Sequence, residues 1–93
     1  MNKKNLRKYR NKIDKVDNRI FILIKNRTQI IKNILSEKKF KNQIVDQKRN
    51  DIILKNIRRR SIQHGVDPKI TSRIWKAMIL SFVDFQRRNF KKK

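Results

Sequence analysis

Residues 6–35 read "LRKYRNKIDKVDNRIFILIKNRTQIIKNIL", and their apolar side chains recur at alternating steps of three and four. This spacing is a heptad seam, which is typical of a long helix that packs at a shallow angle against other helices. Neither Gly nor Pro occurs before residue 40, so the pattern predicts one unbroken helix of about 50 Å. The seam positions are Leu6, Tyr9, Ile13, Val16, Ile20, Leu23, Arg27, Ile30 and Ile34.

The length of this helix bears on the assembly of the chain. The chain has 93 residues, which is enough for one domain with a modest core. The first helix is too long for the core of a compact monomer of this size, so we expect an intertwined homodimer. We expect a single domain over residues 1–93 with no further domain fused to it. Its basic ends, 1–4 and 91–93, are the candidates for disorder.

Two further helices are predicted after the polar stretch 39–43, which we interpret as a loop. Asp46 is suited to cap the second helix, and the only Gly and Pro then arrive together in "HGVDPK". Gly65 suits the end of the second helix, whereas Asp67 and Pro68 suit the start of a third. No run of alternating apolar residues indicates a strand. The sequence therefore predicts an all-α fold of three helices: long, medium and long.

The composition excludes several classes of protein. The chain has no cysteine, which excludes disulfides, thiolate metal sites and thiol catalysis. Its longest apolar run, residues 20–24, is too short to cross a bilayer, and no signal-type apolar stretch follows the basic N-terminus. We therefore expect a cytoplasmic protein without a membrane partner.

The net charge of +21 predicts affinity for anions. One interpretation is a protein that binds nucleic acid or a membrane surface. The other is compositional drift, since Lys, Asn and Ile, which have A/T-rich codons, supply 42 of the 93 residues. We favour drift, and we expect basic runs such as 58–60 and 91–93 to bind nucleic acid only non-specifically.

Five polar side chains fall on helix faces that should be buried. Arg27 occupies the seam itself, and Lys38 lies one helical turn beyond Ile34. An unpaired buried cation is costly, so each of these cations needs an anion. An ion pair within the chain can explain any one of them, but seven acidic residues are too few for the group. The set therefore predicts a small polyanion supplied from outside. Its members are Arg10, Arg27, Lys38, Arg49 and Gln86.

Three segments carry a family pattern. Residues 6–27, "LRKYRNKIDKVDNRIFILIKNR", resemble the first helix of the all-α chorismate mutases of the monofunctional, dimeric type, in which L-R-x-x-I-D-x-(I/L)-D precedes an arginine. Residues 45–54, "VDQKRNDIIL", resemble the second-helix pattern D-x-x-R-E followed by apolar residues. Residues 73–86, "RIWKAMILSFVDFQ", resemble the third-helix segment that ends in a ligand-contacting glutamine. The resemblance covers residues 6–88 in the same order.

This resemblance implies a chorismate mutase of aromatic amino-acid biosynthesis, which converts chorismate to prephenate by an intramolecular Claisen rearrangement. The reaction needs no nucleophile, metal or cofactor, and we expect none here. It needs the substrate held in its reactive conformer. It also needs donors at the ether oxygen, where negative charge builds as the C–O bond breaks. Chorismate carries two carboxylates, which could pair with the inward-facing cations for which the chain has too few acidic residues.

The resemblance assigns the catalytic roles to three residues. Lys38 and Gln86 would donate hydrogen bonds to the ether oxygen, and Lys38 would also contact a carboxylate. Arg27 would hold one carboxylate from within its own subunit. Arg10 would bind the other carboxylate across the dimer, because the first helix of this family enters the partner's site.

Further positions complete the substrate site that the resemblance implies. Arg49 would support the anionic pocket, and Asp46 would lie near the ring hydroxyl of the substrate. Asn50 stands where the family usually has a glutamate for that hydroxyl, and its amide oxygen is a neutral acceptor. Phe82 stands where a serine often contacts a carboxylate, and Ser81 beside it is the candidate substitute. These departures bear on catalytic efficiency more than on the fold.

A second interpretation belongs to a different class of protein. The chain could be a basic helical binding protein, a mutase-fold relative without activity that contacts nucleic acid. The inward-facing cations favour the enzyme, because a protein that binds backbone phosphates needs its cations on the outer surface.

Overall fold

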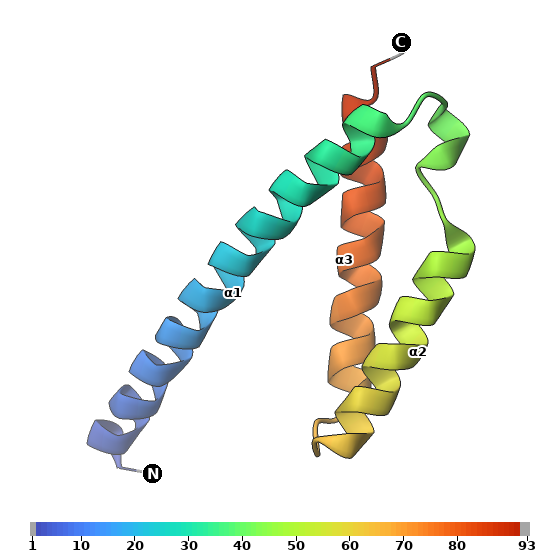
Figure 1. Cartoon of the computed structure of the whole chain (residues 1–93). Helices are drawn as coiled ribbons and strands as arrows, with labels where there is room; N and C mark the ends of the chain where they lie inside the picture. The colour runs from blue at the N-terminus through green and yellow to red at the C-terminus, as the bar shows by residue number, and fades with distance from the viewer. Residues whose placement is uncertain (1, 92–93) are drawn as a thin grey trace. The chain divides into compact units, whose positions relative to one another are not determined.

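The computed structural model describes residues 2–91 and consists of three α-helices and a short 3-10 helix (Figure 1). The elements in chain order are α1 (Lys3–Glu37), η1 (Lys41–Gln43), α2 (Gln47–Gln63) and α3 (Pro68–Asn89). No strand occurs in the described part of the chain. The prediction of an all-α fold with a long, a medium and a long helix is therefore confirmed.

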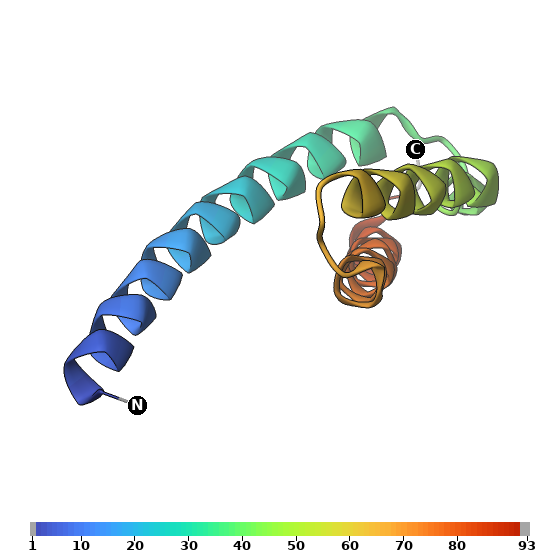
Figure 2. The ribbon, with the colours of Figure 1, turned by 90° about the horizontal axis from the view of Figure 1, so that it is seen from below.

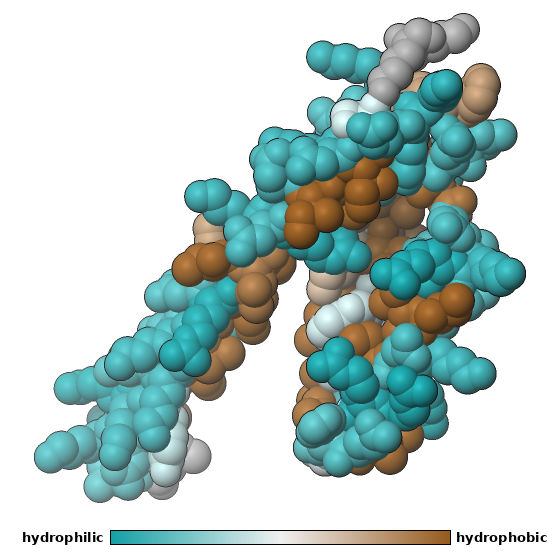
Figure 3. Space-filling model, in the orientation of Figure 1, coloured by the Kyte–Doolittle hydropathy of each residue, from teal (hydrophilic) through white to brown (hydrophobic). Residues whose placement is uncertain are grey.

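Helix α1 is one unbroken helix of 35 residues, and none of its side chains is buried in the single chain. The apolar seam is open to solvent: Leu23 is 65% exposed and Ile30 is 57% exposed. Figure 3 shows apolar side chains on the surface of α1 among hydrophilic ones. Since a helix in a protein owes most of its stability to the packing of its apolar face, α1 needs a cover for this seam.

The chain divides after Lys32 into two compact units. The first contains only α1 up to that residue, and the second contains the last turn of α1, η1, α2 and α3. A single domain over residues 1–93 stays a prediction. Of the ends expected to be disordered, Lys3 and Lys4 form the start of α1. Met1 and residues 92–93 lie outside the described range.

Within the second unit, α2 and α3 lie side by side as an antiparallel pair (Figures 1 and 2). The turn between them follows the predicted signals. Gly65 has a φ of 68°, in the left-handed region that favours glycine, and Asp67 caps α3 by accepting a backbone N–H at 2.9 Å. Pro68 is in the first turn of α3. The hydroxyls of Ser61 and Thr71 lie 2.7 Å apart and link the two helices.

The core of a single chain is small. Among the described residues, Ile44 and Ile79 are the apolar side chains classed as buried. Ile79 lies on α3, and Ile44 lies in the segment between η1 and α2. So little buried apolar surface is unusual for a folded chain of this length.

The segment between α1 and α2 differs from the prediction in one respect. The stretch 39–43, predicted to be a loop, contains the 3-10 turn η1. The side-chain oxygen of Gln43 accepts hydrogen bonds from the backbone N–H groups of Lys39 and Phe40, at 2.8 and 2.9 Å. These bonds order a stretch whose polar composition alone resembles a plain loop. Asp46 caps α2 as predicted, because its Oδ1 accepts the N–H of Arg49 at 3.0 Å.

Candidate active site

Lys38 and Gln86, 48 positions apart in the sequence, are joined directly by a hydrogen bond. The Nζ of Lys38 donates to Oε1 of Gln86 at 2.9 Å and to the backbone carbonyl of Ile44 at 3.4 Å. Lys38 directly follows α1, and Gln86 lies near the end of α3, where it is only 5% exposed. The second unit therefore brings together the two residues that were predicted to act on the ether oxygen.

Both members of this pair have hydrogen-bonding capacity to spare. A lysine ammonium has three N–H donors, and in the described chain two of them go to the neutral oxygens of Gln86 and Ile44. The Nε2 of Gln86 donates to the carbonyl of Phe82 at 3.3 Å, which uses one of its two N–H groups. Because Lys38 occupies Oε1, the amide is oriented with its nitrogen as the remaining donor. The pair can thus offer two adjacent donors to one acceptor.

Partial burial destabilises the charged form of Lys38. Partial burial lowers the pKa of Lys38, and the negative charge of Asp46 opposes this effect without cancelling it. Asp46 is thus the N-cap of α2 and also an electrostatic neighbour of the ammonium group. An anionic ligand beside Lys38 would stabilise its charged form.

Arg27 lies on α1 in the first unit, and it is half-buried. It is less exposed than Leu23 and Ile30, the apolar residues on either side of it in the seam. Burial lowers the pKa of its guanidinium group. Arginine stays protonated all the same, so Arg27 keeps a permanent positive charge on a face made of apolar residues.

The other predicted binding residues differ in their surroundings. Arg10 on α1 and Arg49 in the first turn of α2 are exposed in the single chain. Asn50 is half-buried, and its backbone N–H donates to the carbonyl of Asp46 at 2.9 Å. The structure therefore links Asp46, Arg49 and Asn50 through the start of α2.

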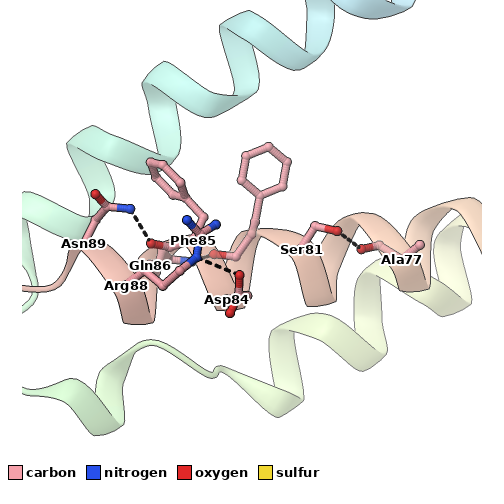
Figure 4. Close-up of polar contacts among 8 residues, drawn as sticks. Ala77, Ser81, Asp84, Phe85, Gln86, Arg88 and Asn89 are labelled. Atoms are coloured by element: carbon pink, nitrogen blue, oxygen red, sulfur yellow. Dashed lines mark hydrogen bonds and ion pairs between the residues drawn. The ribbon is translucent and has the colours of Figure 1, made fainter.

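Phe82 and Ser81 lie on α3, one turn before Gln86. Phe82 is half-buried, and its carbonyl accepts the hydrogen bond from Gln86. The hydroxyl of Ser81 is exposed and donates to the carbonyl of Ala77 at 2.7 Å (Figure 4). This hydroxyl is engaged with its own helix, so it would have to rotate before it could bind a ligand.

Several carboxylates are engaged elsewhere. Asp46 and Asp67 cap helices, Asp51 accepts from Gln47 at 2.9 Å, and Asp84 pairs with Arg88 at 2.8 Å (Figure 4). None of these hydrogen bonds goes to a side chain of the predicted cationic set. Asp46 also acts electrostatically on the ammonium group of Lys38, so an anion supplied from outside the chain stays a prediction.

Two other kinds of site are missing from residues 2–91. No group of three or more His, Asp or Glu side chains there could hold a metal ion. No helix in that range is both long enough and apolar enough to cross a membrane.

Gln43 and Ile44 were not predicted to belong to the site. The carbonyl of Ile44 binds Lys38, and Gln43 orders the turn between them. A backbone acceptor has no sequence signal. Gln43 lies in a polar stretch where nothing distinguishes it from its neighbours.

The fold is all-α, and its second unit joins an ammonium group that directly follows α1 to a buried amide on α3. The family model described as chorismate mutase type II matches residues 9–87. The chain therefore belongs to the chorismate mutase type II family, whose activity is the isomerisation of chorismate to prephenate. No curated protein and no solved structure matches the chain significantly.

Proposed function

We propose that the protein is a homodimeric chorismate mutase whose catalytic residues are Lys38, Gln86 and Arg27. The observation that carries this proposal is the hydrogen bond between Lys38 and Gln86, which leaves one donor on each side chain for a shared acceptor. Membership of the family implies the reaction, and Lys38 and Gln86 would provide the hydrogen-bond donors that the reaction requires. A cytoplasmic location, expected for an enzyme of aromatic amino-acid synthesis, is part of the proposal.

The pair would act on the bond that breaks. In the rearrangement the C–O bond of the enol ether lengthens while a C–C bond forms, and negative charge builds on the ether oxygen. The remaining N–H of Lys38 and that of Gln86 would both bind this oxygen and stabilise the charge most in the transition state. Because both donors are held before the substrate arrives, little reorganisation is needed during the reaction.

The remaining residues would hold the substrate in its reactive conformer. Arg27 would bind one carboxylate, and Arg10 would bind the other from the partner subunit, with Arg49 adding positive charge to the pocket. Bringing the two reacting ends together is an orientation effect, and such effects can lower a barrier substantially.

Asn50 and Phe82 would bind the substrate less strongly than the glutamate and serine that usually occupy these positions in the family. Asn50 would accept a hydrogen bond from the ring hydroxyl beside Asp46, but a neutral amide is a weaker acceptor than a carboxylate. Phe82 adds apolar surface and cannot donate a hydrogen bond to a carboxylate. We expect these differences to reduce efficiency rather than to abolish the activity.

The simplest test of the proposal is to follow the loss of chorismate absorbance with purified protein. Prephenate should form at a rate that is proportional to enzyme concentration. Absence of turnover by a folded, dimeric protein would reject the proposed function.

The homodimer is supported by the exposed seam of α1. A second copy would cover this apolar stripe, and it would also bring Arg10 to the site. We expect a dimer by light scattering at micromolar concentration and moderate salt. Placing a charge in the seam, as in Ile20→Lys, should yield monomers with reduced helix content, because a buried lysine would lack a partner.

Asn18→Lys is the matched control for the dimer. Asn18 is exposed on α1 outside the seam, so the same lysine there should leave the dimer intact. A monomeric mass for the parent protein, or equal masses for both variants, would contradict the predicted assembly.

The lowered pKa of Lys38 predicts how activity and stability change with pH. Loss of the Lys38 proton removes a donor, so kcat/KM should fall in the alkaline range at a lower pH than an ordinary lysine would give. Gln86 is neutral, so its donor does not require an acidic pH. The measurement is the kcat/KM profile of the parent and of Lys38→Arg, whose guanidinium does not titrate in this range. An identical alkaline limb in both would assign it to another group.

The same pKa shift fixes the sign of the effect on stability. The folded-state pKa of Lys38 lies below its unfolded-state value, so the unfolded chain binds more protons between the two values. The free energy of unfolding contributed by this group should therefore rise with pH through that window, as the cost of burying the charge disappears.

The affinity for chorismate and the affinity for nucleic acid should depend differently on salt concentration. Exposed cations such as those at 58–60 should bind DNA or RNA non-specifically, with an affinity that falls steeply as salt rises. The apparent affinity for chorismate should fall far less over the same range, because a few enclosed cations are less screened. Both properties can be measured on one preparation. Selective nucleic-acid binding that survives high salt, without mutase activity, would contradict this prediction.

A further inference from the structure

The side chains of Lys38 and Gln43 both form hydrogen bonds to the backbone of the segment 38–44, which follows α1. The Nζ of Lys38 reaches forward to the carbonyl of Ile44 at 3.4 Å. The Oε1 of Gln43 reaches back to the N–H groups of Lys39 and Phe40, at 2.8 and 2.9 Å. One amide oxygen thus holds the two backbone groups that come directly after Lys38.

The backbone between these side chains is also ordered. The N–H of Gln43 donates to the carbonyl of Phe40 at 3.0 Å, and the N–H of Ile44 donates to the carbonyl of Lys41 at 3.2 Å. The side chain of Ile44 is only 4% exposed, which anchors the far end of the segment. The position of the carbonyl that binds Lys38 therefore depends on this turn.

We propose that Gln43 is a positioning residue for Lys38. It sets the path of the backbone on both sides of the turn, at Lys39 and Phe40 directly after Lys38 and at Ile44, whose carbonyl Lys38 uses. Gln43 does not bind the substrate in this proposal. Its effect on turnover rests on the proposed function, whereas its effect on the environment of Lys38 does not.

Loss of the Gln43 oxygen would change the surroundings of Lys38 in a definite direction. The N–H groups of Lys39 and Phe40 would turn to water, and the segment would open. The ammonium of Lys38 would then gain water, so its pKa should rise towards that of an ordinary lysine. Asp46, the charged group identified as acting on Lys38, is unchanged in this comparison.

The first experiment follows the Lys38 titration by NMR in full-length protein with labelled lysine side chains. The signal of Lys38 is assigned from its absence in Lys38→Arg. In Gln43→Met, which keeps the length but removes the acceptor, the Lys38 pKa should rise above the parent value. In Asn42→Ala, a change at an exposed neighbour in the same turn, it should not move. An unchanged pKa in Gln43→Met, or an equal rise in both variants, would overturn the proposal.

The second experiment measures turnover. Gln43→Met should lower kcat by roughly tenfold with a smaller change in KM, by analogy with the loss of residues that orient metal ligands. Gln43→Glu should stay within a few-fold of the parent, because a carboxylate oxygen also accepts both N–H groups. A folded Gln43→Glu variant that loses as much activity as Gln43→Met would also overturn the proposal. Absence of turnover in the parent would instead reject the proposed function and leave the NMR comparison valid.

Discussion

Lys38→Ala is expected to lower kcat by about a thousandfold, because it removes a charged donor from the oxygen where negative charge develops. The change in KM should be smaller, since this interaction is strongest in the transition state. The alanine also removes the hydrogen bond that orients the Gln86 amide, so the variant loses the alignment of the second donor together with the first. Steady-state kinetics with chorismate measures both parameters.

Lys39→Ala is the matched control for this experiment. Lys39 is exposed and directly follows Lys38, so its removal changes the net charge equally without touching the pair. It should keep activity within a few-fold of the parent. If Lys38→Ala also kept its activity within that margin, the proposed active site would be wrong.

Arg27→Ala should lower kcat/KM by about a thousandfold, because it removes the cation that holds a substrate carboxylate. Alanine is the best helix former, so α1 should keep its helix content, and the dimer should survive. Arg27→Lys should fall between the parent and the alanine variant, since lysine keeps the charge but not the bidentate geometry of a guanidinium. Circular dichroism and light scattering accompany the kinetics.

Arg19→Ala gives the matched comparison on the same helix. Arg19 is exposed and outside the seam, so this change should leave kcat/KM nearly unaltered. Equal losses in the two variants would indicate a general effect of charge rather than a carboxylate bound by Arg27. Activity of Arg27→Ala close to that of the parent would remove Arg27 from the site.

Most of the fold was predictable because its signals are local. A heptad spacing without Gly or Pro predicted α1, and Asp46, Gly65, Asp67 and Pro68 marked where the later helices begin and end. Caps and left-handed turns depend on a few consecutive residues, so a sequence reports them directly. The turn η1 was missed because it depends on one side chain folding back on its own backbone.

The candidate site was predictable only as a set of residue types. Cations on an apolar face indicated an anionic ligand, and a resemblance to a family assigned a role to each position. The match over residues 9–87 shows the family, whereas the role of each residue stays a proposal. Which of these residues touch one another depends on where the helices lie, and the spacing within any single helix does not contain that information.

The sequence by itself determined three helices and the helix caps that bound them. It also predicted that a partner covers the apolar seam and that cations on the helix faces outnumber the available carboxylates. Only the tertiary structure decided that Lys38 binds Gln86, that the carbonyl of Ile44 shares the same ammonium, and that Gln43 orders the turn between them. The physical reason is the range of the interactions. Helices and caps arise from neighbours along the chain, whereas a contact across 48 positions exists only once the end of α3 packs beside the segment that follows α1.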